Sequence, residues 1–401
     1  MNILLNKGLR SRSIIFMLIL ILAFIVLSPN VYGQYSKTGN RSKHAAHKLF
    51  RSNLLLSGNV YYGFIINHHV GMEIYNSHFP SLELSLIKAT YGKKYWEQLY
   101  GYPWIGIAYW YSNLGSSSYL GSAHAIFPHI NFELYSTKKL NLGFRLGAGL
   151  GYLTKTFDRL TNYKHLAIGT HLNFAGNVMF DVRYQANPRL YLTGGISLTH
   201  FSNGSFKLPN YGLNIPSIHA GVAYQLNKPN RYIERRLYDP TKPLEFDLHR
   251  TLELDFVGVI GFKNLDAIFG QKFFVYSLSG NARKEISLKS KLGMGWDISY
   301  DDSDYKMLEK KQIHINKKFS LIKTGVSASY GLAVGKLAFD FNFGMYIYMN
   351  DLDKSDGAFY HKIGIKYDLT DKLFANITLK THWGKADYIG WGMGYRFKLK
   401  Y

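Results

Sequence analysis

The chain closes on the stretch Ile389-Gly-Trp-Gly-Met-Gly-Tyr-Arg-Phe-Lys-Leu-Lys-Tyr401, and this stretch decides the fold class. Every second residue from Ile389 onward is large and apolar, whereas the residues between them are glycine, arginine or lysine. Because side chains two positions apart lie on the same face of a β-strand, one face of this strand is apolar. An apolar closing strand that ends in an aromatic residue is typical of a bacterial membrane β-barrel, whose outer face meets lipid.

The same alternation runs through the chain from Asn53 onward, in segments separated by Gly, Pro, Asn, Asp or Lys. Such segments predict strands. We expect an all-β protein, an antiparallel transmembrane β-barrel of about 16 strands (roughly 14 to 16), because an even number suits a single-chain bacterial barrel. The predicted strands lie near 53–66, 80–92, 103–113, 119–134, 139–155, 164–184, 189–202, 215–227, 249–262, 271–283, 286–300, 321–334, 336–349, 359–368, 372–383 and 387–400.

A connector at 229–248, which contains prolines and several charged residues, divides these strands into a first half at 53–228 and a second half at 249–401. Each half ends with a Thr-His-aromatic sequence, a loop and a closing strand. The chain has a single insertion-type C-terminal strand, which favours one large barrel made from both halves. Two eight-stranded units are the alternative.

The first 33 residues have the pattern of a cleaved signal peptide. Three cations precede an apolar run from Ser13 to Leu27, and Val31 and Gly33 provide the small residues of a cleavage site. The run is about 15 residues long, shorter than the roughly 20 of a membrane-spanning helix. A polar, basic N-terminal arm follows at 34–52. These features predict export to the bacterial outer membrane, with insertion by the outer-membrane assembly machinery.

The composition agrees with a membrane barrel. Aromatic residues make up 16% of the chain and charged residues only 18%, against about a quarter charged in an average soluble domain. No cysteine is present, which excludes disulfides and thiolate metal sites. The formal charge is +22, but the basic residues are scattered. Anionic lipid headgroups or lipopolysaccharide phosphates are therefore the expected counterparts, and nucleic acid is not.

The segment 190–204 carries the candidate chemistry. Its even positions are apolar and must face lipid, and its odd positions are polar and must face the lumen. His200 and Ser202 occupy even positions at the end of the strand. Polar groups are costly to leave unpaired against hydrocarbon, so we expect a functional reason for this pair.

A neighbouring strand provides a third residue. Asn214 lies at the mouth of the strand predicted at 215–227, in the phase of its lipid-facing residues. A hairpin would bring it beside His200, where its carbonyl could orient the imidazole while His200 takes the proton of Ser202. The backbone amides at Asn203 and Gly204 are candidates for binding the oxyanion. Lys207, in the loop that follows, could contact a lipid phosphate.

The sequence His200-x-Ser202-Asn203-Gly204, followed by Pro209-Asn210-x-Gly212-x-Asn214, resembles the active-site signature of outer-membrane lipid esterases. The wider likeness, over residues 53–227, is to the lipid A 3-O-deacylase (acyloxyacyl hydrolase-like) family. That resemblance implies His200 as base and Ser202 as nucleophile. The family's usual third residue is an acid twelve positions after the serine, where this chain has Asn214. The motif is also similar to that of outer-membrane phospholipase A, which has an asparagine at this spacing and is a calcium-dependent dimer.

The resulting hypothesis is an outer-membrane serine esterase that removes an ester-linked acyl chain from lipid A, with lipid A or phospholipid of the outer leaflet as its partner. No cofactor is expected, although a phospholipase A-type esterase, the alternative, implies calcium. The oligomeric state is left open. A further alternative is a non-enzymatic, porin-like barrel in which His200 and Ser202 only cap a strand.

Other histidines fit no active site or metal site. His382 repeats the Thr-His pattern, but its strand phase places it in the lumen, and Gly384 stands where a serine would be needed. The remaining histidines match no zinc-ligand spacing, so lumen or interface positions are expected for them. They are His68, His69, His78, His124 and His129.

Overall fold

The computed structural model describes residues 53–227, 251–265, 270–310, 312, 321–349 and 357–400. The expected signal peptide (1–33), N-terminal arm (34–52) and connector (229–248) lie outside these residues. No helix in the described part of the chain is long and apolar enough to cross a membrane. The all-β, antiparallel fold and the sixteen predicted strands are confirmed.

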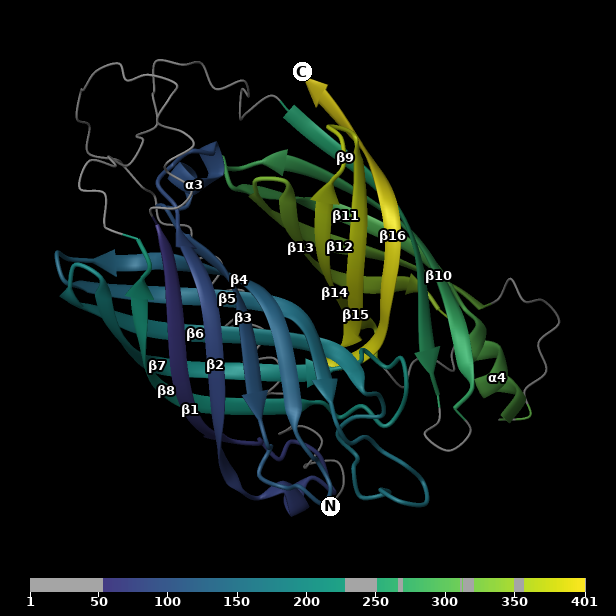
Figure 1. Ribbon diagram of the computed structural model, residues 1–401. Helices are drawn as coiled ribbons and strands as arrows, with labels where there is room; N and C mark the ends of the chain where they lie inside the picture. Colours follow the sequence, from purple (N-terminus) through teal and green to yellow (C-terminus); the bar gives the residue numbers. More distant parts are fainter. Residues whose placement is uncertain are drawn as a thin grey trace. The chain divides into compact units, whose positions relative to one another are not determined.

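The first eight strands close into a barrel in chain order (Figure 1). β8 returns to pair with β1 along nine residue pairs, among them Tyr61 with His219. A short 3-10 helix, η2 (Glu73–Tyr75), and a short helix, α3 (Tyr95–Leu99), lie in two of the connections. The strands are β1 (Leu54–Phe64), β2 (His78–Ala89), β3 (Trp104–Ser112), β4 (Ala123–Ser136), β5 (Leu140–Leu153), β6 (Leu172–Asn187), β7 (Leu190–Ser202) and β8 (Leu213–Gln225).

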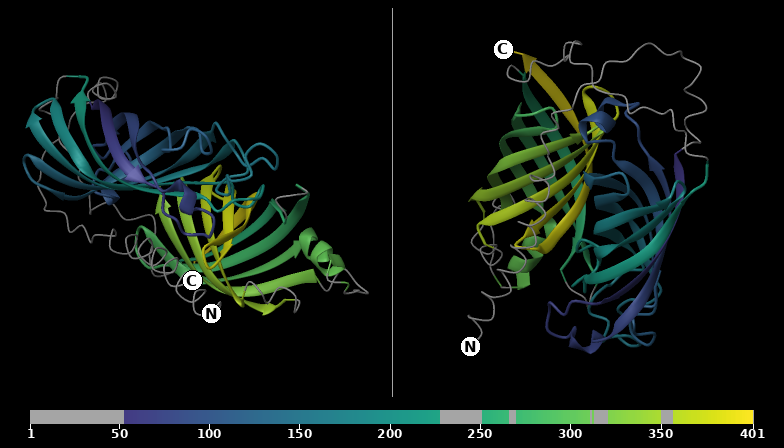
Figure 2. Two further views of the ribbon diagram at one scale, coloured as in Figure 1. Left: turned by 90° about the horizontal axis from the view of Figure 1, so that it is seen from below. Right: turned by 90° about the vertical axis from the view of Figure 1, so that its left-hand side faces the viewer.

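The last eight strands close into a second barrel in the same way, with β16 paired to β9. The sheet of each half curls round until its first and last strands meet, as Figure 2 shows from two sides. One helix, α4 (Asp302–Lys310), follows β11. The strands are β9 (Thr251–Asn264), β10 (Lys272–Glu285), β11 (Ser290–Asp301), β12 (Ile322–Val334), β13 (Leu337–Tyr348), β14 (Phe359–Asp368), β15 (Leu373–His382) and β16 (Lys385–Lys400).

The expected single sixteen-stranded barrel is therefore wrong, and the alternative of two eight-stranded units is right. Once β8 has paired with β1, the described strands of the first half have no free edge for the second half to join. Full closure satisfies every edge within each half. The single aromatic C-terminal strand led to the wrong prediction, because the pattern of that strand carries no information about which strands pair to close a sheet.

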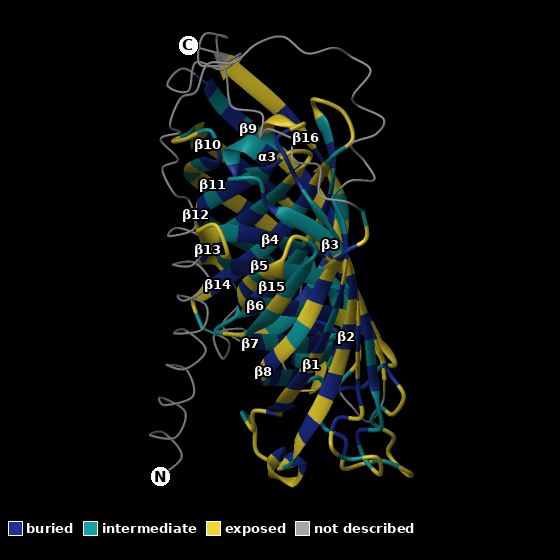
Figure 3. Ribbon diagram, turned by 60° about the vertical axis from the view of Figure 1, so that its left-hand side comes forward, coloured by how far each residue is buried: buried dark blue, intermediate teal, exposed yellow. Residues whose placement is uncertain are grey.

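The strands alternate between lumen and lipid as the sequence pattern requires. Buried and exposed residues follow one another along β2, for example, and give the striped ribbons of Figure 3. Eight-stranded barrels have an interior just wide enough for side chains to fill. In the first barrel this interior contains both a buried apolar cluster, with Trp110, Phe127 and Phe201 among its members, and a set of polar side chains. The Arg145 guanidinium donates two hydrogen bonds, of 2.7 and 2.5 Å, to the Glu83 carboxylate, which also accepts one from the Tyr61 hydroxyl.

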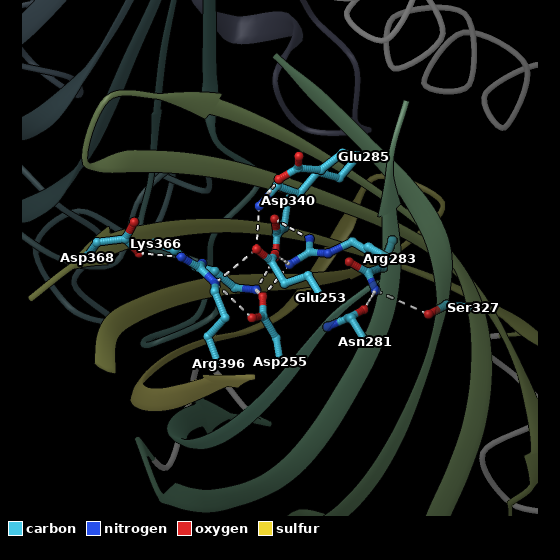
Figure 4. A network of polar contacts seen from close by, with 12 residues as sticks. Glu253, Asp255, Asn281, Arg283, Glu285, Ser327, Asp340, Lys366, Asp368 and Arg396 are labelled. Carbon is cyan, nitrogen blue, oxygen red and sulfur yellow. Dashed lines mark hydrogen bonds and ion pairs between the residues drawn. The ribbon is translucent and has the colours of Figure 1, made fainter. Parts of the chain in front are cut away.

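The lumen of the second barrel holds a network of ion pairs (Figure 4). Arg283 Nη1 donates to Asp340 at 2.6 Å, and its other terminal nitrogen pairs with Asp255. Lys366 and Arg396 pair with the same Asp255 carboxylate, at 2.7 and 3.0 Å. A sixteen-stranded barrel would have had room for a channel. The described strands form two narrower barrels instead, and side chains fill the interior of each. The argument for a porin-like protein from the size of the barrel therefore no longer applies.

Candidate active site

The outer face of β7 carries the residues expected to perform the chemistry. Along this strand Thr199 and Phe201 are buried in the lumen, whereas Ile196 on the alternate face is 58% exposed. His200 and Ser202 share the phase of Ile196 and are half-buried. Both side chains therefore stand on the outside of the barrel wall, at one end of the strand.

Asn214 lies directly beside His200. β8 begins at Leu213, two residues earlier than the sequence predicted, so Asn214 is within the strand and not at its mouth. The two residues are register partners, and Asn214 Oδ1 is 2.7 Å from His200 Nδ1. Because an amide oxygen only accepts hydrogen bonds, Nδ1 carries the hydrogen and donates it. In the neutral ring, Nε2 then has a lone pair that can take a proton.

Asn210, to which the sequence assigned no role, contacts Ser202 directly. Its side-chain Nδ2 donates to Ser202 Oγ at 3.1 Å. Its Oδ1 accepts a hydrogen bond of 2.9 Å from the Asn203 backbone N–H, and this fixes which end of the amide faces the serine. The sequence motif contains Asn210, but the loop between β7 and β8 has no pleat from which the direction of a side chain could be read.

The two residues proposed for the oxyanion site have distinct structural roles. The Asn203 backbone amide donates to Asn210, and its side chain donates to Thr170 Oγ1 at 3.1 Å, in the loop between β5 and β6. Gly204 has a φ of 61°, in the left-handed region that favours glycine. The chain can therefore turn sharply just after Ser202. Lys207 is exposed three residues further on.

A histidine pair from the loop between β1 and β2 approaches the same site. His68 Nε2 lies 3.5 Å from Asn214 Nδ2 and 2.8 Å from the Tyr211 carbonyl oxygen. His69 stacks on the Tyr211 ring, with 4.4 Å between ring centroids. Burial, followed by the neighbouring His68, lowers the pKa of His69 from its ordinary value. The sequence pattern predicted only a lumen or interface position for these two histidines.

The other histidines are dispersed. His78 stacks on Tyr62, His124 lies 2.8 Å from the Tyr109 hydroxyl, and His129 is buried in the lumen. His382 is hydrogen-bonded to Tyr346 at 2.9 Å, in the second barrel. In the described ranges, no group of three or more His, Asp or Glu side chains is placed to hold a metal ion.

Comparison with solved structures gives membrane barrels of low identity. Neisserial surface protein A is 11% identical over 43% of this chain and 97% of its own, with a TM-score of 0.30. The outer membrane enzyme PagL is 14% identical over 41% of this chain and 97% of its own, with a TM-score of 0.29. A mutant Rh. blastica porin is 10% identical over 86% of this chain and 99% of its own, with a TM-score of 0.17. No curated protein matches.

Two protein-family models match, one on each barrel. Residues 82–223 match the model described as lipid A 3-O-deacylase (PagL), and residues 252–399 match acyloxyacyl hydrolase, C-terminal domain. The first range contains the His200-x-Ser202 motif and Asn214, and the two ranges together span well over half of the chain. The chain belongs to the lipid A 3-O-deacylase (acyloxyacyl hydrolase-like) family of outer-membrane ester hydrolases.

Proposed function

We propose that the first barrel removes an ester-linked acyl chain from lipid A, with Ser202 as nucleophile, His200 as general base and Asn214 as the residue that orients His200. The observation that carries this proposal is the 2.7 Å contact between Asn214 Oδ1 and His200 Nδ1, with Ser202 two residues further along the same lipid-facing edge. A nucleophile, a base and an orienting group in this order are the parts of serine-esterase chemistry.

In the proposed acylation step, His200 Nε2 takes the hydroxyl proton of Ser202 while Oγ bonds to the ester carbonyl carbon. The carbonyl oxygen becomes an oxyanion. The intermediate then collapses, the bond to the sugar oxygen breaks, and His200 returns the proton to that oxygen. In the second step water attacks the acyl-Ser202 ester with His200 again as base. The fatty acid leaves and the serine is restored.

Asn210 is the proposed oxyanion donor. Its Nδ2 hydrogen already points at Ser202 Oγ, at 3.1 Å. The Asn203 backbone amide holds the other end of the Asn210 side chain, so the donor is fixed before substrate arrives. Donors fixed in this way cost no reorganisation when charge develops, which is why they stabilise the transition state.

The site lies at the end of the barrel that has the longer connections, and this favours a substrate in the outer leaflet. The connections at this end are 65–77, 113–122, 154–171 and 203–212, whereas two of the three at the other end are only 137–139 and 188–189. Outer-membrane barrels have long extracellular loops and short periplasmic turns. Ser202 is therefore proposed to face the leaflet in which lipid A lies.

The phospholipase alternative keeps one supporting feature, the asparagine in the orienting position. The test compares both substrates by mass spectrometry of lipid A and phospholipids from cells that express the wild type or Ser202→Ala, with and without a calcium chelator. We expect lipid A to lose one acyl chain only with the wild type. Ser197→Ala, on the lumen face of the same strand, is the matched control and should behave as the wild type.

Three outcomes would change the proposal. Unchanged acylation of both lipid pools with the wild type rejects the esterase. Deacylation that survives Ser202→Ala shows that another group is the nucleophile. Loss of acyl chains from phospholipid alone, abolished by chelation, replaces the lipid A substrate with phospholipid and makes calcium a cofactor.

A further inference from the structure

The catalytic candidates account for the ester bond of the substrate but not for recognition of the group that carries it. Ser202 is the last residue of β7, at the end of the barrel with the longer connections. An acyl chain that leaves Ser202 along the lipid-facing wall runs back into the membrane, so the group that carries the ester must lie beyond Ser202, toward the loops. In lipid A this group is a pyranose ring of a glucosamine disaccharide. A side chain that recognises the sugar is therefore expected at the loop end of the site.

Tyr211 lies at this end, between two residues that approach the catalytic pair. Its neighbour Asn210 donates to Ser202 Oγ at 3.1 Å. On the other side, a Cβ atom on Gly212 would lie 3.2 Å from His200 Cε1. Tyr211 itself is 39% exposed, so its side chain does not serve to fill the core. Residue 211 is therefore placed beside the group that Ser202 would attack.

Tyr211 is held in place by two neighbouring loops. His69 stacks on its ring, with 4.4 Å between the ring centroids and 27° between the ring planes. The Tyr211 carbonyl oxygen accepts a hydrogen bond of 2.8 Å from His68 Nε2. The next backbone N–H, of Gly212, donates to the Ala167 carbonyl oxygen at 2.9 Å. Both the ring and its backbone are therefore fixed before a ligand arrives, which lowers the entropic cost of binding.

An exposed aromatic ring suits a sugar better than a phospholipid headgroup. The C–H groups on one side of a pyranose form an apolar patch that packs flat against an aromatic face, whereas a glycerophosphate headgroup has no ring face to offer. Tyrosine provides a large, rigid surface at a low cost in side-chain entropy, because only two torsions have to be fixed. His69 covers one face of the Tyr211 ring, and the residue is still 39% exposed, so a surface remains for a ligand.

We propose that Tyr211, supported by His69, is the sugar-binding residue of this site and selects a saccharide-based lipid as the substrate. This inference rests on the proposed esterase function and names the part of the substrate that the loop end recognises. Tyr211 takes no part in the proton transfers. It binds the substrate and the transition state alike, so its loss should raise KM more than it lowers kcat.

The test compares the full-length wild type with Tyr211→Leu in detergent micelles, on two substrates. One is purified lipid A, and the other is ethyl myristate, which has an acyl ester and no sugar; released fatty acid is measured for both. The ratio of kcat/KM for lipid A to kcat/KM for the ethyl ester should fall about 3- to 10-fold, the range of one aromatic stacking contact. The fall should come mainly from KM for lipid A. A ratio equal to that of the wild type would overturn the proposal.

A matched control separates sugar binding from membrane anchoring, because exposed tyrosines also lie at membrane interfaces. Tyr109 is 42% exposed on the outer face of β3, and its hydroxyl lies 2.8 Å from His124 Nδ1. In the closed order of eight strands, β3 is four strands away from β7 in either direction. Tyr109→Leu should therefore leave both the ratio and the KM for lipid A as in the wild type. An equal effect of Tyr109→Leu and Tyr211→Leu would assign both tyrosines to anchoring and reject the sugar-binding role.

Two further variants identify the group responsible. Tyr211→Phe retains the ring without the hydroxyl and should recover the ratio to within about twofold of the wild type. If it is as poor as Tyr211→Leu, the ring face is not the binding surface and the proposal is wrong. His69→Ala leaves the Tyr211 ring unsupported and should raise KM for lipid A about twofold. An unchanged KM would remove His69 from the proposed site.

Binding of lipid A to the Ser202→Ala protein tests the inference without turnover. Its Kd should rise about 3- to 10-fold when Tyr211→Leu is added. If the wild type does not hydrolyse lipid A, the esterase proposal fails while this measurement still tests the role of Tyr211. If the wild type hydrolyses lipid A and the Kd is unchanged, only the role of Tyr211 fails. A compact form on unboiled gels confirms that each variant is folded.

Discussion

In the proposed mechanism, two side chains near Ser202 have complementary roles. His200 is on the same strand and offers a base, whereas Asn210 comes from the loop and offers a hydrogen-bond donor 3.1 Å from Oγ. Neither side chain carries a charge that would have to be held at the edge of the membrane. The arrangement is therefore less costly in hydrocarbon than an ionised triad, since charge is the most expensive group to place there.

Asn210→Ala should lower kcat by about 10²- to 10³-fold, the loss that follows removal of one oxyanion donor. Substrate binding should change little, because the donor acts mainly on charge that develops in the transition state. Steady-state hydrolysis of lipid A in micelles measures both constants. A loss confined to KM would assign Asn210 to substrate binding instead.

His165, in the loop between β5 and β6, should make stability depend on pH. Its side chain is fully buried, and burial lowers its pKa to about 4. The unfolded chain, with a pKa of about 6.5, takes up a proton more readily than the folded protein. His165 therefore has no effect on the free energy of unfolding above about pH 6.5. As the pH is lowered from 6.5 toward 4, it should reduce the free energy of unfolding by on the order of 3 kcal/mol.

Thermal unfolding of the wild type and of His165→Leu, followed between pH 7.5 and 4.5, measures this effect. The midpoint of the wild type should fall more steeply with acid than that of the variant. Parallel curves for the two proteins would show that protonation of His165 does not contribute.

At the scale of the strands, the register between β7 and β8 sets the site, and the closure of β8 on β1 fixes both strands. Gly221 of β8 lies where a Cβ atom would approach the Gly58 carbonyl oxygen to 2.2 Å. Gly194 of β7, on the outer face, would bring a Cβ atom no closer than 3.5 Å to its nearest neighbour, the His219 carbonyl oxygen. The barrel is thus closely packed where β1 meets β8 and open on its lipid face.

Gly221→Ala should destabilise the barrel by about 1–3 kcal/mol, the usual cost of overpacking, whereas Gly194→Ala should be tolerated. The temperature at which each variant loses its compact form on unboiled gels measures the difference. Equal midpoints for the two variants would mean that β1 and β8 can move apart without cost.

At the scale of the molecule, the two barrels have the same strand number and different interiors. In the first, two buried ion pairs, Glu83–Arg145 and Asp181–Arg183, share the interior with an apolar cluster, and the catalytic candidates stand on the outside. In the second, the lumen is organised around Asp255, which three cations approach. The second barrel is thus held together by buried ion pairs. It matches the acyloxyacyl hydrolase C-terminal domain model, and Gly384 stands where an equivalent of Ser202 would be needed.

Arg283→Met should destabilise the second barrel by about 3–5 kcal/mol, because it leaves buried carboxylates without a partner. Arg283→Lys keeps the charge and should cost less. Calorimetric unfolding in micelles measures both. An Arg283→Met protein as stable as the wild type would show that Lys366 and Arg396 alone neutralise Asp255 and Asp340.

The sequence by itself determined the strands, their two faces and the place of His200 and Ser202 on the lipid side. All of these depend on a period of two, which is a local property of the chain. It also indicated Asn214, although the strand begins two residues earlier than expected. The family resemblance drawn from the same motif agrees with the family models that match the chain.

Only the tertiary structure decided how many barrels the strands form and which loop residues reach the serine. Closure depends on whether β8 meets β1, a pairing between residues more than 150 positions apart, such as Gly63 and Ser217. Asn210 and His68 lie in loops that have no repeating pattern. The Asn210 side chain is directed by the Asn203 backbone N–H of its own loop, and the His68 ring by the Tyr211 carbonyl oxygen, which is 143 positions away. Local alternation contains no information about such contacts, because they depend on how loops fold and on which strands meet.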